Sequence, residues 1–198
     1  RPRVTEVAAA AGHAEGEWLP LVAALEAGSE HVLADALLAY ARGQGHAVTA
    51  AEAFEARPGH GVQGRVGGRS VLVGNASLVG AAGIATAPLA ERAGELEDAG
   101  RTVLWVGVDG ELAGLVAVAD PPRAGAADAV RELQAGGLRV VLLTGDNPRT
   151  AHAVAKQVGA GQVVAGARPE RKAEEVERLR ATGARVAMVG DGIHDAPA

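Results

Sequence analysis

Apolar residues recur every three or four positions in residues 18–27 and 30–42, which predicts two amphipathic helices. Further along, Gly67-Gly68 and Asp109-Gly110 each separate two short apolar segments. These dipeptides accept the positive φ that tight hairpin turns require. The strands are expected at 64–66, 69–73, 102–108 and 111–118, and a helix stopped by Gly100 at 88–99. The pattern up to residue 118 predicts an α+β domain with an antiparallel sheet.

The pattern changes after Asp120-Pro121-Pro122-Arg123, where helices and strands begin to alternate. The expected order is helix 125–135, strand 139–143, helix 148–158, strand 162–164, helix 170–181 and strand 185–189. Strict alternation predicts a parallel sheet with right-handed crossovers, and Asn147 followed by Pro148 is typical of a helix start. We therefore expect an α/β chain of two domains, at 1–118 and 119–198, with the boundary near residues 117–122.

Composition and charge narrow the function classes. The 198 residues are 48% hydrophobic, carry a formal charge of -5 and contain no cysteine. No block of Lys and Arg is present to neutralise a phosphate backbone, so we expect no nucleic-acid partner. Disulfides and thiolate metal sites are excluded without cysteine. No apolar run approaches the ~20 residues of a membrane span, so we expect no contact of this part with the membrane.

A glycine motif, Gly59-His60-Gly61-Val62-Gln63-Gly64, satisfies G-x-G-x-x-G. In a dinucleotide-binding fold this motif follows a strand and opens a helix, whereas here Arg57-Pro58 precedes it and a hairpin follows. The context argues against NAD. Two interpretations stay open, a glycine-rich turn without a ligand and a turn whose glycines let a flat ligand approach the backbone.

Four short elements in order resemble the nucleotide-binding domain of heavy-metal-transporting P-type ATPases. They are Glu26, Ser29-Glu30-His31, Gly59-His60-Gly61 and Gly74-Asn75. The resemblance implies that His31 contacts adenine and that Glu26 contacts the adenine edge. It also implies that Gly59 and Gly61 form the pocket floor, with Asn75 as a supporting polar residue. Taken alone, His31 would more simply be a solvent-facing residue at a helix start.

The second half of the chain resembles the phosphorylation domain of the same family, which is related to haloacid dehalogenases. Asp120-Pro121-Pro122-Arg123 is similar to its hinge motif, and Thr144-Gly145-Asp146 to its phosphate-binding loop. The resemblance implies that Thr144 and Gly145 hold phosphoryl oxygens and that Lys172 pairs with the phosphoryl group. Taken alone, Asp146 is a turn or cap residue and Lys172 a solvated lysine.

The final segment, Gly190-Asp191-Gly192-Ile193-His194-Asp195-Ala196-Pro197, resembles the family's GDGxNDAP signature. The resemblance implies that Asp191 is a Mg²⁺ ligand and Asp195 a supporting carboxylate. Two residues depart from the family pattern, because Val32 stands where the family has proline and His194 where it has asparagine. The DKTGT motif with the phosphorylated aspartate is not among the 198 residues, so we expect this chain alone not to turn over.

The resemblance as a whole implies a nucleotide-binding domain and a partial haloacid dehalogenase-like, Rossmann-like phosphorylation domain. The intact protein would couple ATP hydrolysis, through a phosphoaspartate and Mg²⁺, to transport of a heavy-metal cation, Cu⁺ or alternatively Zn²⁺ or Cd²⁺. Its partners would be ATP or ADP and the transporter's membrane helices and actuator domain, with this part at the cytoplasmic face of the cell membrane. Two alternatives stay open, a non-catalytic nucleotide-binding or sensor module and a haloacid dehalogenase-like soluble phosphatase.

Overall fold

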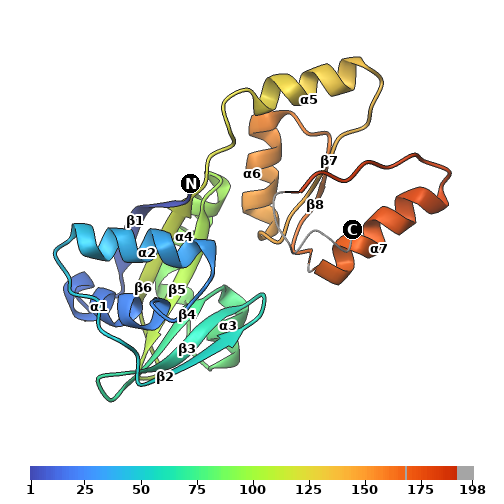
Figure 1. Cartoon of the computed structure of the whole chain (residues 1–198). Coiled ribbons are helices and arrows are strands. Elements are labelled where there is room, and N and C mark those ends of the chain that lie inside the picture. Colours follow the sequence, from blue (N-terminus) through green and yellow to red (C-terminus); the bar gives the residue numbers. More distant parts are fainter. Residues whose placement is uncertain (168, 191–198) are drawn as a thin grey trace. The chain divides into compact units, whose positions relative to one another are not determined.

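The computed structural model describes residues 1–167 and 169–190, and the chain divides into two compact units (Figure 1). Unit 1 is Arg1–Pro122 and unit 2 is Arg123–Ala198. In the described ranges, no helix is both long enough and apolar enough to cross a membrane.

Unit 1 is built on a six-stranded antiparallel sheet, in the order β1-β6-β5-β4-β3-β2. The strands are β1 (Arg3–Ala9), β2 (Ala53–Arg57), β3 (Gly61–Val66), β4 (Arg69–Gly74), β5 (Thr102–Val108) and β6 (Glu111–Ala119). Both predicted hairpins are confirmed. Asp109 is the one non-glycine described residue with positive φ, at 51°, and Gly110 follows it at 82°. Such angles match the right-handed twist of the strands on either side.

The sequence pattern did not reveal β1 or β2. All five residues of β2 are exposed, so this strand has no buried face and no apolar alternation. Its pairing with β3 supplies the hydrogen bonds that make it a strand. β1 also lacks a clear apolar pattern, because it lies at the opposite edge of the sheet and its residues are only partly buried.

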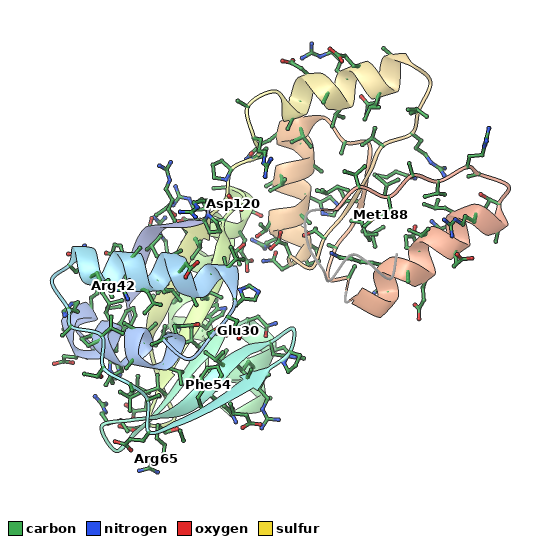
Figure 2. All side chains as sticks on the ribbon, in the orientation of Figure 1. Glu30, Arg42, Phe54, Arg65, Asp120 and Met188 are labelled. Atoms are coloured by element: carbon green, nitrogen blue, oxygen red, sulfur yellow. The ribbon has the colours of Figure 1, made fainter. Side chains whose placement is uncertain are left out.

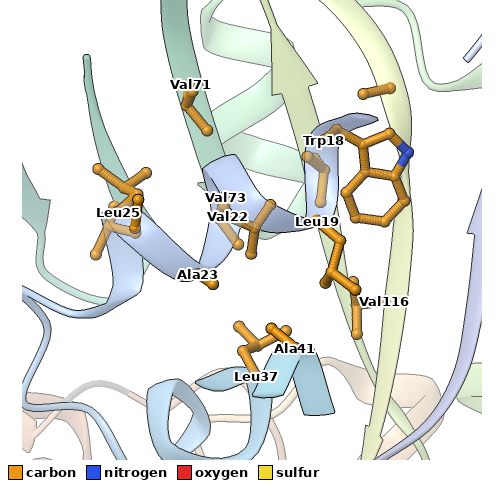
Figure 3. Close-up of a cluster of buried hydrophobic side chains, with 14 of the residues drawn as sticks. Trp18, Leu19, Val22, Ala23, Leu25, Leu37, Ala41, Val71, Val73 and Val116 are labelled. Atoms are coloured by element: carbon orange, nitrogen blue, oxygen red, sulfur yellow. The ribbon is translucent and has the colours of Figure 1, made fainter. Parts of the chain in front are cut away.

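Helices cover both faces of the sheet in unit 1. On one face lie α1 (Glu15–Glu26) and α2 (Val32–Gly43), and on the other α3 (Ala76–Ala81), the 3-10 turn η1 (Ala87–Leu89) and α4 (Ala90–Asp98). Figure 3 shows the core between α1, α2 and the sheet, where Leu25, Leu37 and Val116 are fully buried. Burial of each such side chain contributes about 1.5–3 kcal/mol to the free energy of folding. This core fixes the end of α1 and the start of α2.

Two helices begin at residues other than those predicted. α1 starts at Glu15 instead of residue 18, because the Glu17 carboxylate accepts a 3.4 Å hydrogen bond from the Ala14 N–H and closes the first turn. α2 starts at Val32 instead of residue 30, because His31 is its N-cap residue with extended backbone angles. α3, which the sequence analysis did not predict, starts after the N-cap residue Asn75.

Unit 2 alternates helices and strands as predicted up to its third helix. Its elements are α5 (Ala126–Ala135), β7 (Val141–Leu143), α6 (Pro148–Val158), β8 (Gln162–Val164) and α7 (Pro169–Ala181), with β7 and β8 paired in parallel. The predicted strand at 185–189 is wrong, because residues 184–190 pair with no strand in the part of the chain that the structure describes. A strand exists only where another strand supplies hydrogen-bond partners, and Val189 is 91% exposed. The α/β class is otherwise confirmed.

Candidate functional site

The five residues that join α1 to α2 carry three of the predicted nucleotide contacts. Ser29 accepts a 3.3 Å hydrogen bond on Oγ from the backbone N–H of His31, and its side chain is bonded to the carboxyl group of Glu26. One hydroxyl therefore links the last residue of α1 to the residue that caps α2. Glu30, between Ser29 and His31, is exposed.

The imidazole of His31 has a defined orientation. Its Nδ1 accepts a 3.2 Å hydrogen bond from the backbone N–H of Leu33 in the first turn of α2. A neutral imidazole with Nδ1 as acceptor carries its proton on Nε2. The capping bond thus fixes both the ring position and the tautomer, while the side chain stays exposed. A ring held in this way is suited to contact a flat ligand.

Glu26 is the one acidic or basic side chain that is buried among the described residues, at 6% exposure. Burial raises its pKa from 4.5 to about 7, because the charged form loses its water, while the hydrogen bond from Ser29 opposes the shift. The carboxyl group is therefore divided between its neutral and charged forms near neutral pH. A neutral acid presents one donor and one acceptor, which is the pattern needed at the adenine edge.

The turn between β2 and β3 carries the other predicted nucleotide-binding residues of unit 1. Gly59 has a φ of 73°, and a Cβ placed on it would meet nothing within 4 Å. Asn75 holds this turn through its side-chain amide, which donates to the Gly59 carbonyl at 3.0 Å, and through its backbone N–H, which donates to the His60 carbonyl at 2.8 Å. Its Oδ1 accepts from Leu78 N–H at 3.0 Å and caps α3. Asn75 thus joins the glycine turn to the start of α3.

Gly61 and Gly74 allow close backbone pairing within the sheet. They are directly paired across β3 and β4, and a Cβ on Gly61 would lie 2.2 Å from the Val73 carbonyl oxygen. A Cβ on Gly74 would lie 2.3 Å from the His60 carbonyl oxygen. Both contacts are too short for any side chain. The backbone of β4 alone therefore requires glycine at position 61, and the part of Gly61 in a pocket floor stays a prediction.

In unit 2, the predicted phosphate-binding loop follows β7 directly. The Thr144 hydroxyl donates to Asp146 Oδ2 at 3.0 Å and accepts from the Asp146 N–H at 3.1 Å. The Gly166 N–H donates to the Asp146 carbonyl at 2.7 Å, and the Ala167 N–H to the Thr144 carbonyl at 2.9 Å. The loops after both parallel strands are thus joined at their carboxyl ends, where α/β sheets bind ligands. To donate to a phosphoryl oxygen, the Thr144 hydroxyl must release Asp146.

Of the remaining predicted residues of unit 2, the structure describes only Lys172. Lys172 is partly buried in the first turn of α7, the helix that follows the Gly166 loop. Asp191, Asp195 and His194 lie outside the described residues. Within 1–167 and 169–190, no group of three or more His, Asp or Glu side chains could hold a metal ion.

Comparison with known proteins identifies relatives over the whole chain. The family model for haloacid dehalogenase-like hydrolases matches residues 1–198. A probable copper-exporting P-type ATPase V of Mycobacterium tuberculosis is 48% identical over 199 residues, covering 100% of this chain and 26% of that protein. The chain thus spans about a quarter of the length of the curated relatives it matches.

Solved structures agree with this relationship. A zinc-transporting PIB-type ATPase in the E2·Pi state is 41% identical with a TM-score of 0.62, over 100% of this chain and 32% of that one. The catalytic domain of the CPx-ATPase CopB-B, from a study of conformational changes upon nucleotide binding, is 25% identical with a TM-score of 0.76, over 99% and 67%.

Proposed function

This chain belongs to the haloacid dehalogenase-like hydrolases, and from its site geometry we propose that it is the ATP-binding part of a heavy-metal-transporting P-type ATPase. The whole protein would couple ATP hydrolysis, through a phosphoaspartate, to movement of the metal, and the names of the relatives favour copper. Zinc or cadmium is the alternative cargo, because one structural relative is a zinc transporter.

The observation that carries the proposal is the chain of bonds from Glu26 through Ser29 to His31. It joins a buried carboxyl group at the end of α1 to an exposed imidazole at the start of α2. A ring and a donor–acceptor pair are the two elements that recognise a nucleobase, one through its face and one through its edge. Gly59 completes this site in the proposal, with Asn75 as the residue that supports the turn.

The proposal divides the work between the two domains. Residues 1–118 bind the nucleotide, and residues 119–198 form part of the phosphorylation domain. There, Thr144 and Gly145 hold phosphoryl oxygens, Asp146 orients Thr144, and Lys172 neutralises charge on the transferred group. Asp191 binds Mg²⁺ with Asp195 in support, and the metal would neutralise charge on the phosphates. The partners are membrane helices and an actuator domain, and the site faces the cytoplasm.

Calorimetric titration with ATP, ADP and NAD tests the proposal. We expect binding of ATP and ADP but not NAD, and a loss of affinity of about tenfold for His31→Ala, which is typical of removing a ring that contacts a base. His46→Ala is the matched control, because His46 follows the opposite end of α2. Equal affinities for wild type and His31→Ala, or a preference for NAD, contradict the adenine assignment.

A further inference from the structure

An aromatic side chain outside the predicted site lies against the connection that carries it. Phe54 is on the edge strand β2 (Figure 2) and is 39% exposed. Trp18 and Trp105 are buried. An exposed apolar ring on an edge strand is a liability for association with other chains. A contact that needs the ring would account for its presence there.

That contact is with Gly28, in the middle of the connection between α1 and α2. A Cβ on Gly28 would lie 3.2 Å from Cγ and Cδ2 of the Phe54 ring, so the glycine backbone lies directly on the ring. Leu25, at the end of α1, lies equally close to the neighbouring strand β3. Its Cδ1 would be 2.8 Å from a Cβ on Gly64. Gly64 is the cross-strand partner of Phe54. Small residues at both positions let the connection approach the β2–β3 hairpin closely.

The ring therefore supports the segment that holds the bond chain from Glu26 to His31. Gly28 donates its backbone N–H to the Leu25 carbonyl at 3.2 Å, and Ser29 donates to the Glu26 carbonyl at 2.9 Å. Ser29, directly after Gly28, accepts from His31 at 3.3 Å. A shift of Gly28 moves Ser29 with it, and a hydrogen bond already at 3.3 Å is lost readily on such a shift.

We propose that Phe54 is a positioning residue for nucleotide binding, which acts through Gly28 and Ser29 to hold the His31 ring in place. This inference rests on the proposed function, because it assigns a further residue to the same site. Phe54 itself needs no contact with the nucleotide. Its effect on affinity should then depend on the presence of the His31 ring.

A double-mutant cycle measures this dependence. We expect Phe54→Ala to weaken ATP binding by about tenfold in the wild-type background, and by less than about twofold in the His31→Ala background. Phe54→Tyr should bind as wild type, because its ring is retained and the added hydroxyl reaches solvent. Gly28→Ala, which keeps the ring but adds a Cβ 3.2 Å from it, should weaken binding in the same way if Phe54→Ala fails to fold.

Tyr40→Ala is the matched control for loss of a half-buried ring. Tyr40 lies on α2 at eight residues from Val32, about 12 Å along the helix. The Tyr40→Ala variant should have lower thermal stability than wild type but the same affinity for ATP. The inference is overturned if folded Phe54→Ala binds ATP as wild type does, or if it loses the same factor with and without His31. Failure of the wild-type chain to bind ATP overturns the proposed function itself, and the inference with it.

Discussion

Glu26 is the residue whose chemistry the fold changes most. At the last position of α1 it is buried against the core, and its pKa rises from 4.5 to about 7 because burial disfavours the charged form. In the folded state it holds a proton that the unfolded state releases above pH 4.5. Folding stability therefore falls as pH rises from 4.5 to about 7, and levels off above that.

Glu26→Gln removes this titration. A shift of about 2.5 units corresponds to about 3 kcal/mol, so the wild type should lose up to this free energy of unfolding between pH 4.5 and 7. The variant should lack this fall in stability between pH 4.5 and 7. Urea unfolding followed by tryptophan fluorescence measures it, since Trp18 and Trp105 both lie in unit 1.

Glu30→Gln, the same substitution on an exposed neighbour, is the control and should leave the wild-type profile intact. A variant at position 26 that keeps the wild-type slope would show that another group carries the pH dependence.

At the scale of elements, the start of α2 sets the orientation of His31. Val32 occupies the first helical position and is 55% exposed. The backbone N–H at this position has no acceptor within a helix, so proline is favoured there. His31 already has φ -76° and ψ 139°, the region that a residue before proline adopts. The departure from the family's proline therefore leaves the backbone of His31 in the geometry that proline would impose.

Val32→Pro should stabilise the protein by about 0.4–1 kcal/mol, because proline restricts the unfolded chain and fits the folded one. The expected readout is a higher urea midpoint, with nucleotide affinity equal to or above that of wild type. Val32→Ala is the control, because it removes the valine side chain without introducing proline. This variant should not raise the urea midpoint. A lower midpoint for Val32→Pro would mean that the start of α2 is not the one described.

At the scale of the whole molecule, the proposed function assigns different parts of one reaction to the two units. Unit 1 carries the ring, the carboxyl group and the glycine turn, and unit 2 carries the Thr144 loop and Lys172. In the proposal these groups bind the nucleotide and stabilise charge, but a phosphoenzyme requires a nucleophile that forms the covalent bond. The DKTGT motif that would supply it is not among these 198 residues.

The 198-residue chain should accordingly bind ATP without becoming phosphorylated. Incubation with γ-labelled ATP, acid quenching and counting of protein-bound label measure this, and the expected count equals that of a heat-denatured control. A longer chain that includes the motif should incorporate label, and Lys172→Ala in that chain should reduce it. Acid-stable label on the 198 residues alone would show that a nucleophile within them had been overlooked.

The sequence by itself determined the elements whose causes are local. The turns at Gly67-Gly68 and Asp109-Gly110 need particular backbone angles, and Asn147-Pro148 caps and starts α6, so neighbouring residues suffice to predict both. The candidate residues of the nucleotide site were also visible, because a family resemblance is carried by residue order.

Only the tertiary structure decided what depends on residues far apart in the chain. The five exposed residues of β2 form a strand through pairing with β3, while residues 184–190 pair with no other described strand. Gly61 proved to be required by the β4 backbone opposite it, and Glu26 acquired its raised pKa from the core around it. Pairing, close approach and desolvation are set by what the folded chain brings together, and the local sequence contains no record of them.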